Sequence, residues 1–227
     1  MNIDFVIPWV NGNDEEWLKE KNRYTPKNTD SRENRYRDLD NLQYWFRGVE
    51  LFAPWVRKIH FITWGHLPKW LNTNHPKLNI VKHSEFIPNE FLPTFNANTI
   101  ELNIHRINEL SEYFVYFNDD TYIIRRMNEK DFFIDELPCD SAILDAIAPS
   151  ELFSHILFNN IEIINRYYDK KNIIKNNFGK WINFKYGKEI YRTFALLPWT
   201  KFTGFKNIIY QLLFVKTYSL NYGYSLK

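Results

Sequence analysis

The sequence predicts an α/β protein built on an open sheet flanked by helices, followed by an irregular, mainly helical carboxyl-terminal part. In the first half of the chain, short apolar segments alternate with segments of helical period, which favours an open sheet over a sandwich or a bundle. With 44% hydrophobic and 18% aromatic residues among 227, the chain can bury a sizeable core. The periodic signal weakens towards the carboxyl terminus, so we expect an α/β core at residues 1–145 and a helical part at 146–227.

The strand predictions rest on short runs of β-branched and aromatic residues. The first run ends at the turn signal Asn11-Gly12, and the fourth ends abruptly at Asn118-Asp119-Asp120. The expected strands are residues 3–10, 58–64, 78–82 and 113–117, with a fifth at 141–146.

The helix predictions rest on apolar spacing and on helix-ending residues. Pro54 ends one helix, and isoleucines at 100, 104 and 107 form an apolar stripe along another. The expected helices are residues 13–21, 39–52, 96–110 and 152–167, with a loop at 22–34. Basic and aromatic residues at 172–177 and 183–191 show no clear period.

Charge and cysteine content exclude several protein classes. A net charge of +2 argues against a dedicated nucleic-acid binder. The single cysteine, Cys139, excludes an internal disulfide and a cysteine-based zinc site, and it fits a reducing compartment such as the cytoplasm. Residues 1–10 lack the features of a signal peptide, and no apolar stretch approaches the roughly 20 residues that span a bilayer. We therefore expect a cytoplasmic protein with at most peripheral membrane contact.

Asp119 and Asp120 follow directly after an apolar, aromatic strand. In an open α/β sheet, the carboxyl ends of the strands border the crevice that binds ligands. Two carboxylates with the Asn118 amide oxygen suit a hard divalent cation, Mg²⁺ or Mn²⁺, which neutralises a diphosphate. The alternative is an ordinary polar turn after a strand.

The end of the first strand, Trp9-Val-Asn11-Gly12, offers an indole face for a base and a backbone turn for phosphate or ribose. The alternative is a strand exit with Trp9 in the core. Arg35 and Arg37 could contact phosphates near the start of the second helix.

Glu101, His105 and Arg106 lie on the predicted helix at 96–110. A spacing of four places Glu101 and His105 on one side of a helix, opposite the isoleucine stripe, with Arg106 on a neighbouring line. Such a face could direct a carboxylate, an imidazole and a guanidinium into a cleft; the alternative is a solvated polar face. Asp38 and Asp40 likewise have two interpretations, as site residues or as caps of the second helix.

The histidines show no close metal-ligand spacing, and we expect structural or surface roles for His60, His66, His75 and His83.

Taken together, these segments resemble the Stealth family, whose members include bacterial capsular polysaccharide phosphotransferases and the animal enzyme that adds N-acetylglucosamine-1-phosphate to lysosomal glycoproteins. The first conserved region is matched by Asp4 to Gly12. The second is matched by residues 35–44, 53–57, 62–65, 68–71, 92–95, 100–101, 104–107 and 116–120.

The resemblance implies a GT-A-like nucleotide-sugar-binding fold and transfer of sugar-1-phosphate from a UDP-sugar to a glycan hydroxyl. It implies a divalent cation at Asp119 and Asp120, with the diphosphate. The nucleotide would lie against Trp9, Asn11, Gly12 and Arg37. The reacting centre would be lined by Glu101, His105 and Arg106, with Asp38 and Asp40 behind them. Partners would be a nucleotide-sugar donor and a glycan acceptor, free or lipid-linked, placing the protein in the cytoplasm or at the inner face of the membrane.

The family's third region contains a His-x-Pro motif, a candidate source of the catalytic base. Residues 197–207 resemble the approach to that region, but the sequence then runs into Ile208-Ile-Tyr-Gln-Leu-Leu213 without the histidine. We therefore expect a truncated, frameshifted or divergent member. Two other functions stay open: an ordinary metal-dependent GT-A glycosyltransferase and a non-catalytic nucleotide-sugar-binding remnant.

Overall fold

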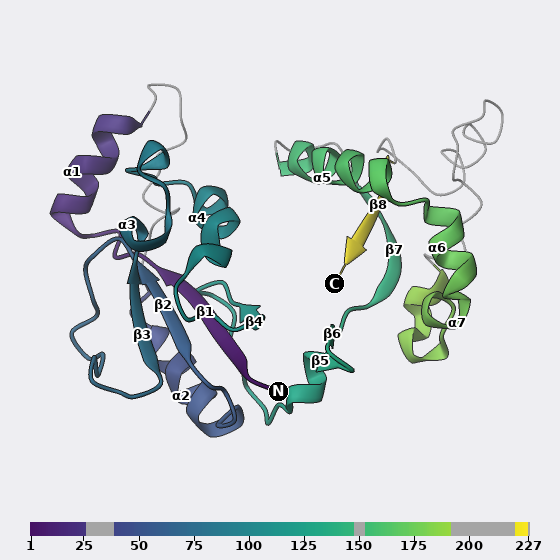
Figure 1. Ribbon diagram of the computed structural model, residues 1–227, viewed down its shortest axis with the longest axis horizontal. Helices are drawn as coiled ribbons and strands as arrows, with labels where there is room; N and C mark the ends of the chain where they lie inside the picture. The colour runs from purple at the N-terminus through teal and green to yellow at the C-terminus, as the bar shows by residue number, and fades with distance from the viewer. Residues whose placement is uncertain (26–38, 148–152, 192–220, 227) are drawn as a thin grey trace. The chain divides into compact units, whose positions relative to one another are not determined.

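The computed structural model describes residues 1–25, 39–147, 153–191 and 221–226 (Figure 1). The chain forms two compact units, Met1–Pro138 and Cys139–Lys227, so the division falls shortly before the predicted boundary at residue 145. Among the helices that the structure describes, none has both the length and the apolar character needed to cross a bilayer.

The first unit is an α/β unit, as the sequence predicts. Its main strands are β1 (Ile3–Trp9), β2 (Ile59–Thr63), β3 (Leu78–Lys82) and β4 (Tyr113–Tyr116). Its helices are α1 (Glu15–Tyr24), α2 (Leu42–Phe52), α3 (His83–Phe86) and α4 (Ala97–Asn103). Short 3₁₀ turns lie at Asn89–Phe91, Ile104–Arg106 and Glu129–Asp131, and a two-stranded ribbon is formed by β5 (Phe133–Ile134) and β6 (Leu137–Pro138).

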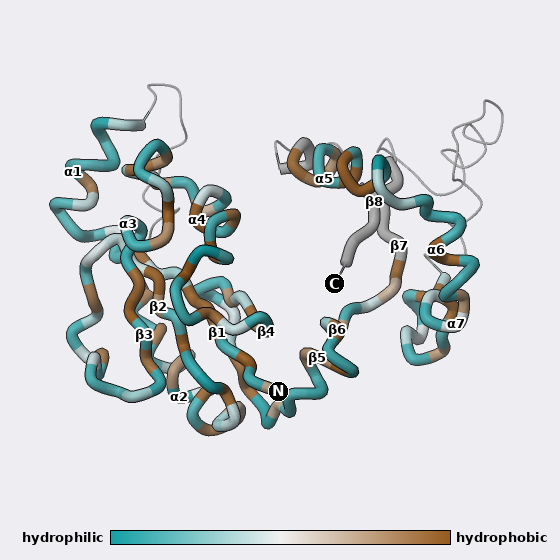
Figure 2. Tube along the Cα trace, in the orientation of Figure 1, coloured by the Kyte–Doolittle hydropathy of each residue, from teal (hydrophilic) through white to brown (hydrophobic). Residues whose placement is uncertain are grey.

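The four main strands form one parallel sheet in the order β3-β2-β1-β4. Apolar residues dominate these strands, which are largely brown in Figure 2, whereas α1 is mostly hydrophilic. This pattern is typical of parallel strands that are covered on both faces. The α/β fold class with an open sheet is therefore confirmed.

Alternate residues of β1 and β2 supply the two faces of the sheet. Phe5, Ile7 and Phe61 belong to a core cluster that includes α2, whereas Val6 and Ile62 pack with α3 and the turn after α4 (Figure 1). The period of two along each strand explains this division.

The predicted helix at 96–110 is wrong in its extent. Its regular part ends at Asn103, and a 3₁₀ turn at Ile104–Arg106 follows. The predicted apolar stripe is correct, because Ile104 and Ile107 are buried in the second core cluster. A 3₁₀ turn has about three residues per turn, so it brings Ile107 under Ile104 without a continuous α-helix.

A buried polar network lies at the amino end of the sheet, around the Asp4 carboxylate. Asp4 and His60 are both completely buried. The carboxylate accepts hydrogen bonds from Arg57 Nε at 2.8 Å, from Arg57 Nη2 and from the Ser111 backbone N–H at 2.8 Å, and His60 Nε2 lies 3.0 Å away. On its other side, the His60 ring lies 3.0 Å from the Asn79 amide. The network therefore ties β1 to β2, β3 and the segment before β4.

The second unit combines helices with a small antiparallel sheet. The predicted strand at 141–146 and helix at 152–167 correspond to β7 (Ala142–Ile147) and α5 (Phe153–Tyr167). The structure adds α6 (Lys170–Asn176), α7 (Phe178–Trp181), a 3₁₀ segment (Phe184–Glu189) and β8 (Asn221–Leu226), which pairs with β7. The absence of a clear sequence period at 172–177 and 183–191 reflects how short α6 and the 3₁₀ segment are, since a helix of one or two turns shows too few repeats.

Candidate functional site

The carboxyl ends of the sheet strands meet at one edge, where parallel α/β sheets bind ligands. Trp9, the last residue of β1, is level with Thr63 of β2, which is level with Lys82 of β3. Tyr116 of β4 pairs with Val6, so the acidic turn that follows β4 leaves the sheet close to this edge. The loops after all four strands therefore supply candidate site residues.

The turn after β1 is fixed by several hydrogen bonds. Asn11 Oδ1 accepts from the Asn13 N–H at 3.0 Å, and Gly12 lies in this turn. The backbone N–H of Asn11 donates to His66 Nε2 at 2.7 Å. Asp14 then caps α1 by accepting from the Trp17 N–H at 2.8 Å. The sequence Asn-Gly-Asn-Asp thus forms a tight, internally bonded exit from the strand.

Trp9 lies in the core, the alternative that its position at the strand end left open. Its exposed fraction is 8%, and its ring stacks on Phe61 at 5.8 Å between centroids. The edge of its ring meets His66 at 5.2 Å. Most of the indole therefore contacts protein, although Trp9 also lines a pocket.

That pocket, of about 300 Å³, brings together three of the predicted site residues, Trp9, Asn11 and Asp40. Its other walls come from the segment after β2 and from the start of α2: Leu42, Leu67, Pro68, Lys69 and Trp70. Sequence reasoning gave Lys69 and Trp70 no role, although Pro-Lys-Trp directly follows the loop at the end of a strand. The pocket offers an ammonium group, an amide, a carboxylate and an exposed aromatic ring.

Asp40 does not cap α2, contrary to one interpretation of the sequence. The N-cap is Asn41, without a side-chain capping hydrogen bond, and Asp40 has a φ of 51°. This left-handed conformation is tolerated by Asp because its short polar side chain can bond locally. Asp38, together with Arg35 and Arg37, lies outside the described residues.

Asp119 and Asp120 form an exposed turn directly after β4. The Thr121 N–H donates to the Asn118 carbonyl at 3.1 Å, which closes the turn. The chain beyond it is anchored on α2: the Ile123 carbonyl approaches Gly48 so closely that a Cβ there would lie 2.7 Å from it, and the Met127 N–H donates to the Phe52 carbonyl at 2.9 Å. The acidic turn is therefore held between two fixed segments.

The two carboxylates of this turn are the kind of ligand that suits a divalent cation to which the protein supplies only one or two ligands. No group of three or more His, Cys, Asp or Glu side chains with metal-binding geometry occurs in the described parts of the chain. Mg²⁺ characteristically takes one or two carboxylates and keeps waters or substrate oxygens as its other ligands. Asp119 and Asp120 could supply that share.

Glu101 reaches β4, whereas His105 and Arg106 lie beyond the end of α4. Glu101 Oε1 accepts from the Tyr116 hydroxyl at 3.0 Å. Burial, reinforced by the carboxylates of Glu101 and Asp119, raises the pKa of Tyr116. His105 and Arg106 are exposed in the 3₁₀ turn, where a four-residue spacing no longer aligns side chains. The predicted helix that would place Glu101 and His105 on a common face therefore ends before His105.

Two histidines that were assigned surface or structural roles lie at the same edge of the sheet. His66 follows β2, and His83 begins α3. Burial lowers the pKa of both, in His83 to about 4, with an added contribution from His66. The Nδ1 atom of each is buried and finds no hydrogen-bond partner among the described residues. Their position one to three residues beyond a strand end was the only sequence signal.

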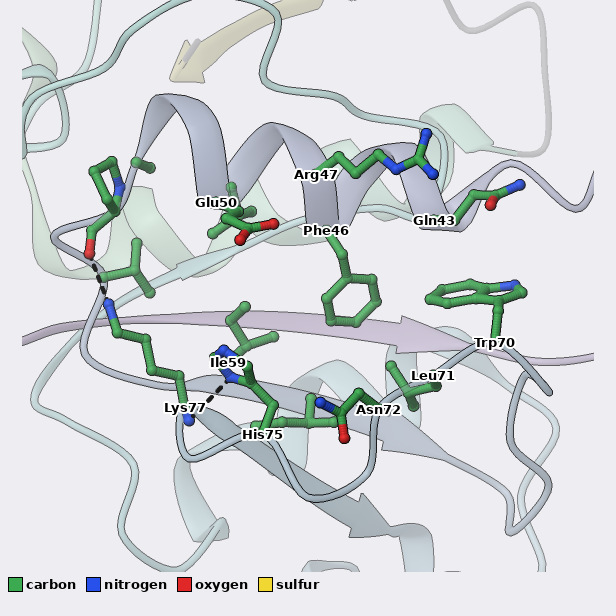
Figure 3. Close-up of a pocket in the computed structure, with 15 residues that line it drawn as sticks. Gln43, Phe46, Arg47, Glu50, Ile59, Trp70, Leu71, Asn72, His75 and Lys77 are labelled. Carbon is green, nitrogen blue, oxygen red and sulfur yellow. Dashed lines mark hydrogen bonds between the residues drawn. The ribbon is translucent and has the colours of Figure 1, made fainter.

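A larger pocket of about 520 Å³ lies between α2 and the crossover from β2 to β3 (Figure 3). Phe46 points into it from α2, and Trp70 lies at one end, where it also borders the smaller pocket. At the other end Lys77 Nζ donates to the Pro54 carbonyl at 2.6 Å. Of the sequence-predicted site residues that the structure describes, none lines this pocket.

Two regions of the sequence match models of a known protein family. Residues 1–29 match Stealth protein CR1, conserved region 1, and residues 35–139 match Stealth protein CR2, conserved region 2.

Similar curated proteins come from several bacteria. The chain is 48% identical over 210 residues to a capsular polysaccharide phosphotransferase, WcwK, of Streptococcus pneumoniae, a match that covers 90% of this chain and 63% of the relative. It is 50% identical over 191 residues to the capsular polysaccharide phosphotransferase eps5J of Streptococcus thermophilus, covering 82% and 80%. It is 40% identical over 207 residues to the exopolysaccharide phosphotransferase cps2G of Lactiplantibacillus plantarum, covering 91% and 61%.

The chain thus spans less than two thirds of the length of the pneumococcal and Lactiplantibacillus relatives. The resemblance seen in the sequence is nevertheless confirmed, because both conserved regions match the family models. The chain is also 50% identical to a relative of which it covers 80%. The chain belongs to the Stealth family.

Proposed function

We propose that this chain takes part in the transfer of a sugar-1-phosphate from a UDP-sugar to a glycan hydroxyl during capsular or exopolysaccharide synthesis. The acceptor oxygen forms a bond to the phosphorus next to the sugar, the bond from that phosphorus to the bridging oxygen of UMP breaks, and the hydroxyl proton passes to a base. The observation that carries the proposal is similarity to phosphotransferases of these pathways, joined to an acidic turn at the ligand-binding edge of the sheet.

The proposed donor site lies along the carboxyl edge of the sheet. Asn11 and Gly12 offer backbone and amide groups to the nucleotide, beside the part of Trp9 that lines the smaller pocket. Asp40 lines the same pocket, which supports placing it against the donor. The pocket has a volume of about 300 Å³, which is the lower limit of the roughly 300–1,000 Å³ found for pockets that bind drug-sized ligands. It therefore suits one ring of the donor.

Asp119 and Asp120 would hold a divalent cation, Mg²⁺ or Mn²⁺. When bound, the cation supplies neutralisation of the diphosphate charge that grows as UMP leaves. The two side chains fix its position because their turn is anchored on both sides. Arg37 would add a phosphate contact from the segment before α2.

Glu101, His105 and Arg106 would line the reacting centre, with Asp38 nearby. Glu101 is oriented by the Tyr116 hydroxyl, which supports a fixed role for this carboxylate. His105 and Arg106 are exposed, so they are open to an incoming acceptor or phosphate. The acceptor would be a polysaccharide hydroxyl, free or lipid-linked, at the inner face of the membrane.

The released nucleotide tests this proposal. The 227-residue chain is incubated with UDP-N-acetylglucosamine, UDP-glucose or UDP-galactose, Mg²⁺ or Mn²⁺, and polysaccharide acceptors, and the nucleotides are separated by chromatography. UMP release supports phosphoryl transfer. UDP release would overturn it in favour of a glycosyltransferase, and donor binding without turnover would identify a nucleotide-sugar-binding protein.

A further inference from the structure

We propose that His66 is the positioning residue of the donor-binding turn, and that it holds the turn only as a neutral imidazole. The inference rests on the proposed function, because that function places the donor at Asn11 and Gly12. It adds a residue and a form of regulation: the turn is held at neutral pH and released in acid.

The geometry of one hydrogen bond assigns the tautomer of His66. The Asn11 backbone N–H donates to His66 Nε2 at 2.7 Å, across 55 positions of sequence. A ring nitrogen that accepts a hydrogen bond carries no proton, so the proton of the neutral ring lies on Nδ1. This bond joins the exit of β1 to the exit of β2, at the edge where the donor is proposed to bind.

Hydrogen bonds fix the backbone of His66, and two aromatic rings lie close to its imidazole. The Thr63 hydroxyl donates to the His66 carbonyl at 2.6 Å and accepts from the Gly65 N–H at 3.2 Å. The Trp9 ring is perpendicular to the His66 ring with 5.2 Å between centroids, and the Trp64 ring lies at 5.8 Å between centroids. The end of β2 therefore fixes the backbone from which the His66 ring reaches Asn11.

The groups that surround His66 act in opposite directions on its charge. Asp14, at the start of α1, has Oδ2 3.7 Å from His66 Nδ1, too far for a hydrogen bond but near enough to favour a positive ring. His83 of α3 interacts electrostatically with His66, and Glu20 of α1 is bonded to the neighbouring Trp64. Burial outweighs Asp14, so the pKa of His66 lies below its usual value and the ring is neutral at pH 7.

Protonation converts the acceptor into a donor. A charged imidazole carries a proton on both nitrogens, so Nε2–H would face the Asn11 N–H and the bond could not persist. Because the pKa of His66 is lowered, the hydrogen bond to Asn11 is present at and above neutral pH. It is lost as the pH falls through the pKa that His66 has in the folded protein.

The test compares His66→Gln, His66→Leu and a control, His75→Gln, on the 227-residue chain. His75 is an exposed histidine in the β2–β3 crossover and does not line the smaller pocket. Binding of UDP with Mg²⁺ is measured by calorimetry between about pH 7.5 and pH 5. The protonation of the His66 ring and the exchange of the Asn11 amide are followed by ¹⁵N NMR.

We expect His66→Leu to bind UDP about tenfold more weakly than the wild type at neutral pH, the loss of roughly one hydrogen bond. The Gln side-chain oxygen can accept from Asn11 and does not titrate. His66→Gln should therefore bind as the wild type does at neutral pH and lose less affinity in acid. His75→Gln should keep the wild-type pH profile, which separates the effect of His66 from titration of UDP itself.

Two results would overturn the inference: a proton on His66 Nε2 at neutral pH, or a His66→Leu variant with wild-type affinity and pH profile. Absence of UDP binding by the wild type at every pH would instead refute the donor site. The NMR readouts still decide the role of His66 in that case, since the Asn11 amide should exchange faster in His66→Leu but not in His66→Gln.

Discussion

The two ends of the same parallel sheet use aspartate and histidine in opposite ways. At the amino end, Asp4 and His60 are completely buried, and the Asp4 carboxylate is hydrogen-bonded to three residues, Arg57, His60 and Ser111. At the carboxyl end, Asp119 and Asp120 are exposed on a turn between anchored segments. The kind of residue is the same, so the surroundings decide whether a carboxylate is buried in a hydrogen-bonded network or exposed to solvent.

The pKa of Asp4 shows what the buried surroundings do. Burial alone would raise it, but hydrogen bonds from Arg57, His60 and Ser111 together bring it below its usual value. The charged form is therefore the one that the fold stabilises. Because its pKa is lower in the folded protein than in the unfolded chain, the Asp4 carboxylate stabilises the fold at pH values above its pKa in the unfolded chain. This contribution is lost as the pH falls through the pKa of Asp4 in the folded protein.

The largest expected effect is that of Asp4→Ala. Removing one partner of a buried charged network leaves the others desolvated, and we expect a loss of about 3 kcal/mol in the free energy of unfolding, measured by urea denaturation. Arg57 is partly exposed, so we expect a loss of stability at the low end of the range for breaking a buried ion pair.

The control is Glu109→Gln, which removes an exposed carboxylate that pairs with Lys58 beside the same network. We expect its unfolding midpoint to stay nearly unchanged, because exposed ion pairs contribute little. Equal effects of the two variants would mean that burial does not distinguish the amino-end network from the surface.

The second effect concerns the carboxyl end, through Asp119→Asn together with Asp120→Asn. We expect this double variant to lose the metal-dependent part of UDP-sugar binding, a decrease of at least about tenfold by calorimetry. Its free energy of unfolding should change by no more than about 0.5 kcal/mol, because both side chains are exposed.

A matched control is Asp135→Asn with Glu136→Gln, two adjacent exposed carboxylates in the turn between β5 and β6. This pair carries the same charge but does not border the carboxyl edge of the sheet. Unchanged binding in the Asp119 and Asp120 variant, or an equal loss in the control, would remove the acidic turn from the metal site.

Much of the fold could be predicted from the sequence because it depends on local patterns. The parallel strands are short and mostly apolar, and β3 has the bounds that the sequence predicts. The helix at 96–110 could not be bounded in this way, because an isoleucine stripe satisfies both an α-helix and a 3₁₀ turn over a few residues.

The contacts within the sites could not be predicted, because they join distant positions. Asp4 and His60 are 56 residues apart, and Asn11 and His66 are 55 apart. Only the register of the sheet brings each pair together. The strand ends indicated which residues would reach the carboxyl edge, but not that His66 would accept from Asn11, nor that Trp70 would border two pockets.

The smallest expected effect joins strand and site, through Tyr116→Phe. This change removes the hydroxyl that donates to Glu101 and keeps the ring, so we expect a loss of about 1 kcal/mol or less in the free energy of unfolding. UDP-sugar binding should stay the same, because Glu101 is proposed for the reacting centre and not for the donor. If Glu101 acts there, the rate of UMP release should fall while the donor KM is kept.

Tyr44→Phe, at an exposed tyrosine of α2, is the control and should change neither the free energy of unfolding nor the rate of UMP release. A Tyr116→Phe variant with an unchanged rate would show that this hydrogen bond only stabilises the fold, as the Asp4 network does at the other end of the sheet.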